Sequence, residues 1–340
     1  MAKILMVGGT GNISTAVSEQ LLLGGHELHL LCKNDNNELP PVLSGAFVTF
    51  GDINDEAETA EYLQNHHFDA VVNWIVMEPT DMERDIRLFS GKTKQYIFIS
   101  TAAAYQKPLP SYLITERTPL ANPHWEYARK KIACEHILMD AYERHGFPAT
   151  IIRPSLTYGD RYIPYHMSAS KKPWSLINRI RSGKRVIMPG DGTSLWTVTH
   201  SIDFAQGLCG LTANPRAIGQ DFHITSDEVL TWNDILRHIG DAVDAEAKPA
   251  HISTEFILAF MPEKAGSLLG DKVVSTVFDN SKLKAYVPGY QARISFAEGI
   301  KRVVGFFDTH PSWHITDDAH EALMDKIIAA HDYGKALAIN

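Results

Sequence analysis

The sequence predicts an α/β fold, a doubly wound parallel sheet followed by a smaller mixed cap in the C-terminal part of the chain. Two observations carry this prediction. In the first half, short apolar runs alternate with amphipathic stretches of helical period, which is the pattern of right-handed βαβ units. Beyond residue 154 the alternation stops and the chain becomes irregular. A mixed C-terminal half suits a cap over the carboxyl ends of the strands, where doubly wound sheets bind ligands.

The expected elements follow from these runs. Strands are predicted at residues 4–7, 28–31, 47–50, 70–75, 96–99 and 150–152. Helices are predicted at residues 15–23, 55–65, 80–89 and 124–144. We therefore expect a first domain over residues 1–158, completed by about 194–225, and a cap formed by 159–193 and 226–340.

Composition narrows the class of protein. A chain of 340 residues with 44% hydrophobic and 21% charged residues is typical of a globular protein of two domains. The net charge of −8 disfavours a surface that follows nucleic-acid phosphates. No apolar run approaches the 18 residues of a membrane span. Three cysteines without a Cys-x-x-Cys pair suit a reducing compartment, so we expect a cytoplasmic protein.

A glycine-rich turn joins the first expected strand to the first expected helix. Its residues are Gly8, Gly9, Thr10, Gly11, Asn12 and Ile13. Glycine permits a tight turn and a close approach of the backbone to a pyrophosphate, and the helix N-terminus supplies N–H groups to the phosphates. Ser14 stands where the third glycine of the usual motif would pack helix against strand. The placement predicts a Rossmann-type dinucleotide-binding domain rather than a plain turn.

The ends of the second and third strands bear on the choice of cofactor. NAD-binding domains usually carry a carboxylate at the end of the second strand, where this chain has Lys33. Lys33 either meets the 2′-phosphate of NADP or is a solvated loop lysine. Asp52 and Ile53 follow the third strand, where the aspartate can accept from the adenine amino group or cap a turn. The expected cofactor is NADP or NAD.

Tyr127 and Lys131 are four residues apart in a strongly helical stretch, so they share one face of the helix. A tyrosine with its ordinary pKa of about 10 is a poor acid–base catalyst at neutral pH. Lowering that pKa by ~3 units takes about 4 kcal/mol of differential stabilisation. The Lys131 ammonium and a cationic nicotinamide ring are candidates to provide it. The alternative is an ordinary surface pair.

Together with Thr101, after the fifth expected strand, these motifs resemble the extended short-chain dehydrogenase/reductase superfamily. The resemblance is strongest to its NAD-dependent epimerase/dehydratase branch and runs from residue 1 to about 305. It implies that Tyr127 is the acid–base residue, that Lys131 binds the nicotinamide ribose and tunes the tyrosine, and that Thr101 holds the substrate oxygen. Ser155 and Trp196 are further candidates for substrate binding.

Three departures from the family pattern reduce the number of reactions and substrates that we expect. The acidic pair that sugar-nucleotide dehydratases carry after the threonine is Ala102 and Ala103 here, so dehydration is not expected. Trp196 stands where nucleotide-sugar members place an arginine on the diphosphate, which disfavours such a substrate. Its indole either stacks on the substrate or packs internally. The short stretch between Asn73 and Ser100 resembles the chloroplast stem-loop-binding relatives, which serve RNA binding.

Three functions remain open. The first is an NAD(P)-dependent oxidoreductase that interconverts a secondary alcohol and a ketone on a sugar or polyol-like substrate. The second is a sugar epimerase that acts by transient oxidation with retained NAD. The third is a non-catalytic module that binds the dinucleotide or RNA. The expected partner is a small-molecule substrate, with a homodimer left open, and neither a membrane, a nucleic acid nor a metal is expected.

Overall fold

The structure is a computed structural model that describes residues 1–33, 39–169 and 171–339. Its centre is a seven-stranded, all-parallel sheet in the order β12-β7-β5-β4-β1-β2-β3. The strands are β1 (Lys3–Val7), β2 (Glu27–Cys32), β3 (Phe47–Phe50), β4 (Ala70–Asn73), β5 (Tyr96–Ile99), β7 (Ala149–Pro154) and β12 (Gln220–Ile224). This confirms the predicted doubly wound sheet. The chain reverses its direction of strand addition between β1 and β4, which is the place where such sheets bind ligands.

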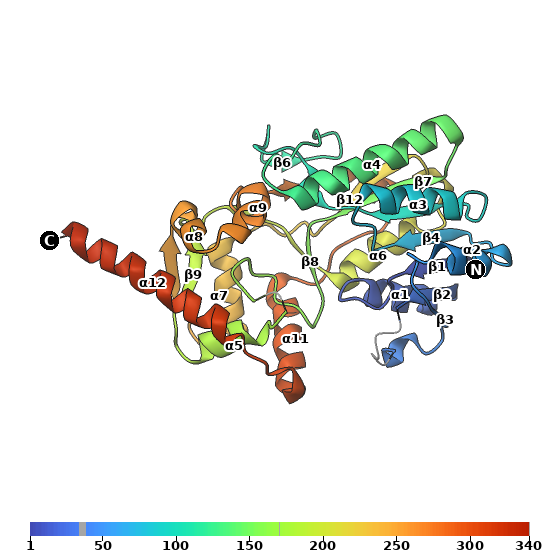
Figure 1. Cartoon of the computed structure of the whole chain (residues 1–340). Helices are drawn as coiled ribbons and strands as arrows, with labels where there is room; N and C mark the ends of the chain where they lie inside the picture. Colours follow the sequence, from blue (N-terminus) through green and yellow to red (C-terminus); the bar gives the residue numbers. More distant parts are fainter. Residues whose placement is uncertain (34–38, 170, 340) are drawn as a thin grey trace.

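Helices cover both faces of this sheet (Figure 1). The helices are α1 (Ser14–Leu23), α2 (Glu56–Gln64), α3 (Pro79–Phe89), α4 (Glu126–His145) and α6 (Ser201–Leu211). On one face α1 and α6 bury Val17 and Phe204 against the sheet. On the other, α3 and α4 bury Met82 and Leu138. Both cores are apolar because central parallel strands are buried on both sides.

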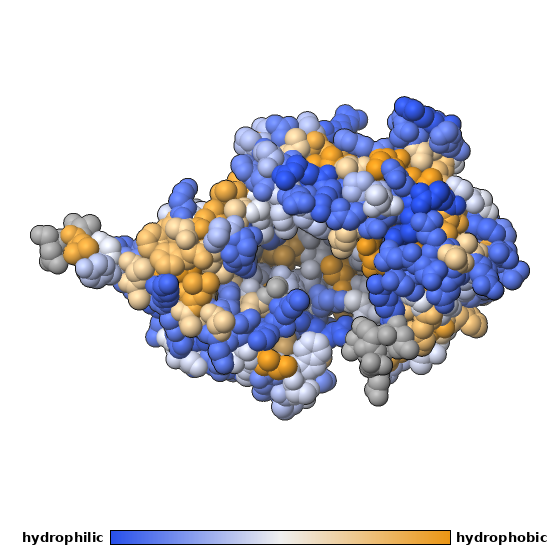
Figure 2. Space-filling model, in the orientation of Figure 1, coloured by the Kyte–Doolittle hydropathy of each residue, from blue (hydrophilic) through white to orange (hydrophobic). Residues whose placement is uncertain are grey.

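A second part of the molecule is built from the later chain. Its helices are α5 (Trp174–Arg181), α7 (Trp232–Ala242), α8 (Thr254–Phe260), α9 (Ala265–Ser267), α11 (Phe296–Thr309) and α12 (Asp318–Ile339), whereas α10 (Ser281–Tyr286) packs on β12 and α6 of the sheet. Short paired strands join them: β6 (Leu113–Ile114) with β15 (Val277–Phe278), β8 (Leu156–Tyr158) with β11 (Val198–His200), β9 (Val186–Pro189) with β14 (Pro249–Ile252), and β10 (Leu195–Trp196) with β13 (Leu230–Thr231). Figure 2 shows the surface hollowed between this part and the sheet.

This second part has a core of its own, which includes Ile177, Ile235 and Ile300. We propose that it corresponds to the expected cap and that the sheet with its helices corresponds to the first domain. The strand β12 supports the expected contribution of residues from about 194–225, since it completes the central sheet. None of the helices in the described ranges combines the length and the apolar stretch that a bilayer span requires.

Candidate active site

A cavity of about 640 Å³ lies at the carboxyl edge of the sheet and reaches the second part of the molecule. Its walls come from the segments that follow β1, β4, β5 and β7, and from the turn before β15. The residues are Gly8, Gly11, Asn12, Ile13, Ser14, Trp74, Ile75, Thr101, Ala102, Ala103, Trp125, Tyr127, Pro154, Ser155, Leu156, Thr157, Tyr162, Asp271 and Lys272. Parallel strands bring these distant segments together because their carboxyl ends share one edge.

The glycine turn forms one end of this cavity. Gly8 has a φ of +83°, a conformation that favours glycine. Gly9 faces inward instead, and a Cβ there would lie 2.8 Å from Leu30 Cδ2. Gly9 therefore lines neither this cavity nor its neighbour, and packing against β2 is what requires glycine at that position. Ser14 closes the turn, since its hydroxyl donates to Gly8 O at 2.9 Å and accepts from Gly11 N at 2.8 Å.

Polar atoms without partners mark this end as a binding site. Helix α1 begins after Ile13, and no side chain caps its first N–H groups. The buried Oδ1 of Asn12 and Nε1 of Trp74 have no hydrogen-bond partner among the described residues. Buried polar groups are normally paired, so these atoms call for a polar ligand. A free helix N-terminus with a glycine turn fits the pyrophosphate of a dinucleotide.

A neighbouring cavity of about 330 Å³ continues from Gly8 towards the ends of β2 and β3. Lys33, Asp52, Ile53 and Thr10 line it, and we call it the adenosine cavity because the sequence predicts that these residues bind the adenosine part of the cofactor. Lys33 Nζ lies 2.8 Å from Asp52 Oδ2, and both side chains are substantially exposed. The hydrogen bond from Lys33 lowers the pKa of the Asp52 carboxyl. The sequence did not predict that Lys33 and Asp52 contact each other, and the structure shows them as one ion pair in the lining of the cavity.

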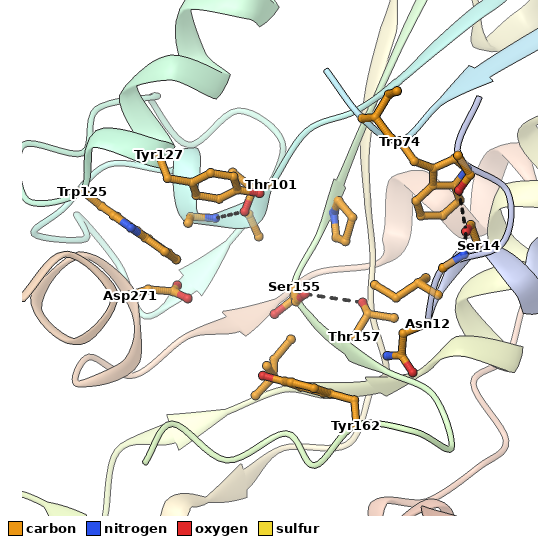
Figure 3. Close-up of a pocket in the computed structure, with 18 of the residues that line it drawn as sticks. Asn12, Ser14, Trp74, Thr101, Trp125, Tyr127, Ser155, Thr157, Tyr162 and Asp271 are labelled. Atoms are coloured by element: carbon orange, nitrogen blue, oxygen red, sulfur yellow. Dashed lines mark hydrogen bonds between the residues drawn. The ribbon is translucent and has the colours of Figure 1, made fainter. Parts of the chain in front are cut away.

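Thr101 and Tyr127 face each other in the main cavity (Figure 3). Thr101 follows β5, and Tyr127 lies in the first turn of α4. Burial raises the pKa of the Tyr127 phenol, while a hydrogen bond with Thr101 lowers it and the Asp271 carboxylate raises it further. The net pKa is above the ordinary value of 10.0. The Lys131 ammonium therefore does not bring this pKa below its ordinary value, while the lowering expected from a cationic nicotinamide ring stays a prediction.

Lys131 is not among the groups that shift the pKa of Tyr127 in the structure. Its ammonium is buried, donates to Val76 O at 2.6 Å and Ile99 O at 2.9 Å, and lies 5.9 Å from the centre of the Tyr127 ring. Burial lowers the pKa of Lys131 to about 8. The ammonium is held by these two carbonyl groups, and Lys131 is not among the residues that line the cavity. Its contact with a nicotinamide ribose stays a prediction.

Of the two further candidates for substrate binding, Ser155 lies in the cavity and Trp196 does not. Ser155 lines the cavity directly after β7. Trp196 does not: its side chain is 1% exposed, packs against Trp232 with ring centres 5.4 Å apart and lies under the ammonium of Lys272. The expectation that its indole stacks on the substrate is wrong, because burial in the core of the second part keeps it from the cavity. The alternative of internal packing is what the structure shows.

Several residues that line the cavity were not predicted from the sequence. Trp74 follows β4 and lies beside the glycine turn, while Trp125, Tyr162, Asp271 and Lys272 surround the far end of the cavity. The position of Trp74 after a buried strand was a usable signal, because each strand end reaches the same edge. Asp271 gave no signal, since 144 residues separate it from Tyr127 and only tertiary structure joins them.

Relatives of known name share most of this chain. A 2′-dehydrokanamycin reductase of Streptomyces kanamyceticus is 24% identical over 291 residues, which are 86% of this chain and 80% of that protein. A chloroplast stem-loop binding protein of 41 kDa from Arabidopsis thaliana is 24% identical over 316 residues, which are 89% and 74% of the two chains. The first name denotes a reductase and the second a binding protein, so the relatives differ in activity.

The fold and the family are also matched. A UDP-glucose 4-epimerase of Bifidobacterium longum, solved with NAD⁺ and UDP, superposes with a TM-score of 0.73 at 18% identity, over 92% of this chain and 99% of that one. The model of the NAD dependent epimerase/dehydratase family matches residues 4–225, which is more than half of the chain. The chain therefore belongs to the NAD-dependent epimerase/dehydratase family, a family of extended short-chain dehydrogenase/reductase enzymes that use a nicotinamide dinucleotide.

Proposed function

We propose that this enzyme interconverts a secondary alcohol and a ketone on a sugar or polyol-like substrate, with net oxidation or reduction of NAD(P). The observation that carries the proposal is the pairing of the Thr101 and Tyr127 hydroxyls in the cavity that begins at the glycine turn. A hydrogen-bond donor and an acid–base group placed together are what carbonyl reduction needs at the substrate oxygen.

The side chains beside this pair support the proposal further. Ala102 and Ala103 follow Thr101 and line the cavity, and neither methyl group can move a proton. Elimination of water would need an acid or base at this place, so the pair disfavours a dehydratase. The relative named as a reductase agrees with a redox reaction.

The roles of the residues follow from their chemistry. A bound dinucleotide supplies or accepts the hydride. In reduction, the protonated Tyr127 donates its phenolic proton to the substrate oxygen, and the Thr101 hydroxyl donates a hydrogen bond to the same oxygen. Because burial raises the pKa of Tyr127, the phenol is in the proton-donating form at neutral pH.

Deuterium transfer tests the proposal. The enzyme is incubated with NADPH or NADH deuterated at the transferred position and a panel of keto sugars, and product is analysed by mass spectrometry. We expect one deuterium in the alcohol and one oxidised cofactor for each product molecule. Interconversion of epimers without net oxidation of cofactor would show the epimerase alternative instead. Cofactor binding without turnover of any sugar would favour the third alternative, a non-catalytic binding module. The Arabidopsis relative is named as a binding protein of this kind.

We also propose that the enzyme prefers NADP. Lys33 and Asp52 form an exposed ion pair at the adenosine cavity, and the ammonium is the partner that a 2′-phosphate would need. Lys33→Ala is expected to weaken NADPH binding by about tenfold, because a charge-assisted hydrogen bond is lost and the Asp52 carboxylate is left facing the phosphate. NADH binding should change little. Fluorescence titration measures both affinities, and equal affinities in the unaltered protein would contradict the preference.

A further inference from the structure

The far end of the cavity, beyond Thr101 and Tyr127, is a distinct arrangement of side chains. Trp125 from the start of α4 presents its indole next to Tyr127, with ring centres 5.0 Å apart. Asp271 projects its carboxylate into the space below them, as Figure 3 shows. Tyr162 and Lys272 complete the wall. We call Trp125, Tyr162, Asp271 and Lys272 the distal subsite.

A buried asparagine holds the distal subsite in place. Asn122 is 3% exposed, and its amide donates to Ala103 O at 2.7 Å and to Gly270 O at 2.8 Å. Its Oδ1 accepts from the backbone N–H groups of His124 and Trp125 at 3.1 and 3.2 Å. One side chain thus ties the loop after Thr101, the start of α4 and the turn before Asp271. The subsite is pre-organised, because all four hydrogen bonds of Asn122 go to fixed backbone.

Asp271 belongs to a π-helical turn, Leu268–Lys272, a rare conformation that is frequent at functional sites. Asp271 is 7% exposed, and its Oδ2 accepts a hydrogen bond from the Lys272 ammonium at 2.6 Å. Among the hydrogen bonds of the described residues, none involves Oδ1 of this carboxylate. Lys272 and the nearby Lys107 already compensate its charge. An uncharged donor suits the free oxygen better than another cation.

We propose that the distal subsite binds the part of a sugar ring next to the reacting carbon, with a ring hydroxyl donating to Asp271 Oδ1. The apolar C–H face of the ring packs on the Trp125 indole. This deepens the proposed function and rests on it, because the reacting carbon must lie at Tyr127. It makes Asp271 a residue for specificity, with no role in proton transfer.

The test compares parent and deoxy sugars in a double-mutant cycle. Oxidation of methyl α-D-glucopyranoside and its 2-, 3-, 4- and 6-deoxy analogues by NADP⁺ is followed at 340 nm with the unaltered enzyme and with Asp271→Ala. We expect one deoxy position to raise KM by about tenfold in the unaltered enzyme, as for a hydrogen bond to a charged group. In Asp271→Ala, parent and deoxy sugar should have the same KM. Asp271→Asn keeps the side-chain shape, guards against misfolding and should reduce the discrimination.

Lys107→Met is the matched control, because it removes a charge that compensates Asp271 from a residue that does not line the cavity, and it leaves the carboxylate. It should retain the discrimination between parent and deoxy sugar. The proposal is overturned if Lys107→Met abolishes the discrimination as Asp271→Ala does, or if Asp271→Ala lowers kcat a hundredfold for every sugar, as loss of an acid–base group would. If the unaltered enzyme oxidises none of the sugars, the proposed function fails on this panel. Calorimetric binding of the same pairs then tests the subsite alone, and equal affinities for parent and deoxy sugars would overturn it.

Discussion

Tyr127→Phe is expected to lower turnover by roughly 10²- to 10⁴-fold, the usual contribution of a general acid–base group. The substitution removes only the hydroxyl and keeps the ring that packs beside Trp125. Because the Tyr127 hydroxyl is part of neither the glycine turn nor the cavity at Lys33 and Asp52, the affinity for the dinucleotide should barely change. Steady-state kinetics and fluorescence titration measure the two quantities separately. An undiminished turnover would exclude Tyr127 as the proton donor, even though the fold and family remain.

Thr101→Val is the companion variant. It keeps the branched shape and removes the hydroxyl that hydrogen-bonds with Tyr127. Its loss of turnover should be smaller, because Thr101 orients the substrate oxygen without transferring the net proton.

The same prediction extends to pH. Since burial raises the pKa of Tyr127, the reductive rate should be constant through neutral pH and fall only at high pH, where the phenol loses its proton. The oxidative rate should rise with pH over the same interval, because the phenolate is then the form that accepts a proton. The cationic ring of the oxidised dinucleotide would move the oxidative curve to lower pH, whereas the ring of the reduced dinucleotide is uncharged. In Tyr127→Phe this dependence should disappear.

The second large effect concerns stability. Glu135 and Arg153 are both buried, and they form a two-pronged pair with contacts of 2.6 to 3.2 Å. Glu135 lies two turns after Tyr127 on α4, so the pair fixes the helix to β7. Glu135→Gln should reduce the free energy of unfolding by about 3–5 kcal/mol, because it leaves Arg153 buried with less compensating charge. Urea denaturation monitored by circular dichroism measures this loss.

An exposed ion pair on the same helix provides the control. Lys130 contacts Glu78 at 2.7 Å and Glu126 at 3.0 Å, and the three side chains are 37% to 69% exposed. Lys130→Met should leave the midpoint of urea denaturation nearly unchanged, since exposed pairs are screened. If both variants lose the same small amount of stability, the buried pair does not anchor α4.

Six of the seven strands of the sheet were predictable because their signals are local, whereas β12 was not predicted as a strand. Each apolar run that predicted a strand lies within a strand of the sheet or overlaps one, and the glycine turn and the helical pair of Tyr127 and Lys131 follow from spacing. The confirmed family resemblance rests on the same short motifs. Hydrophobic periodicity and turn chemistry act over a few residues, so one sequence is enough to read them.

Electrostatics and long-range packing were not predictable in this way. The shift of the Tyr127 pKa depends on burial and on Asp271, which a helical spacing does not reveal. Trp196 was misplaced because an aromatic residue in a loop motif reads equally as a ligand platform or as core, and its partners Trp232 and Lys272 come from other elements. The distal subsite depends on contacts of Asn122 with residues up to 148 positions away.

The π-helical turn that carries Asp271 has an evolutionary consequence. Its residues border the substrate end of the cavity and make no part of the adenosine cavity. If the distal subsite binds the sugar as proposed, substitutions of Asp271 would change which sugar is accepted without altering the cavity at Lys33 and Asp52. A gene lineage could then exchange substrates through a few codons near 271 while its cofactor site is inherited unchanged.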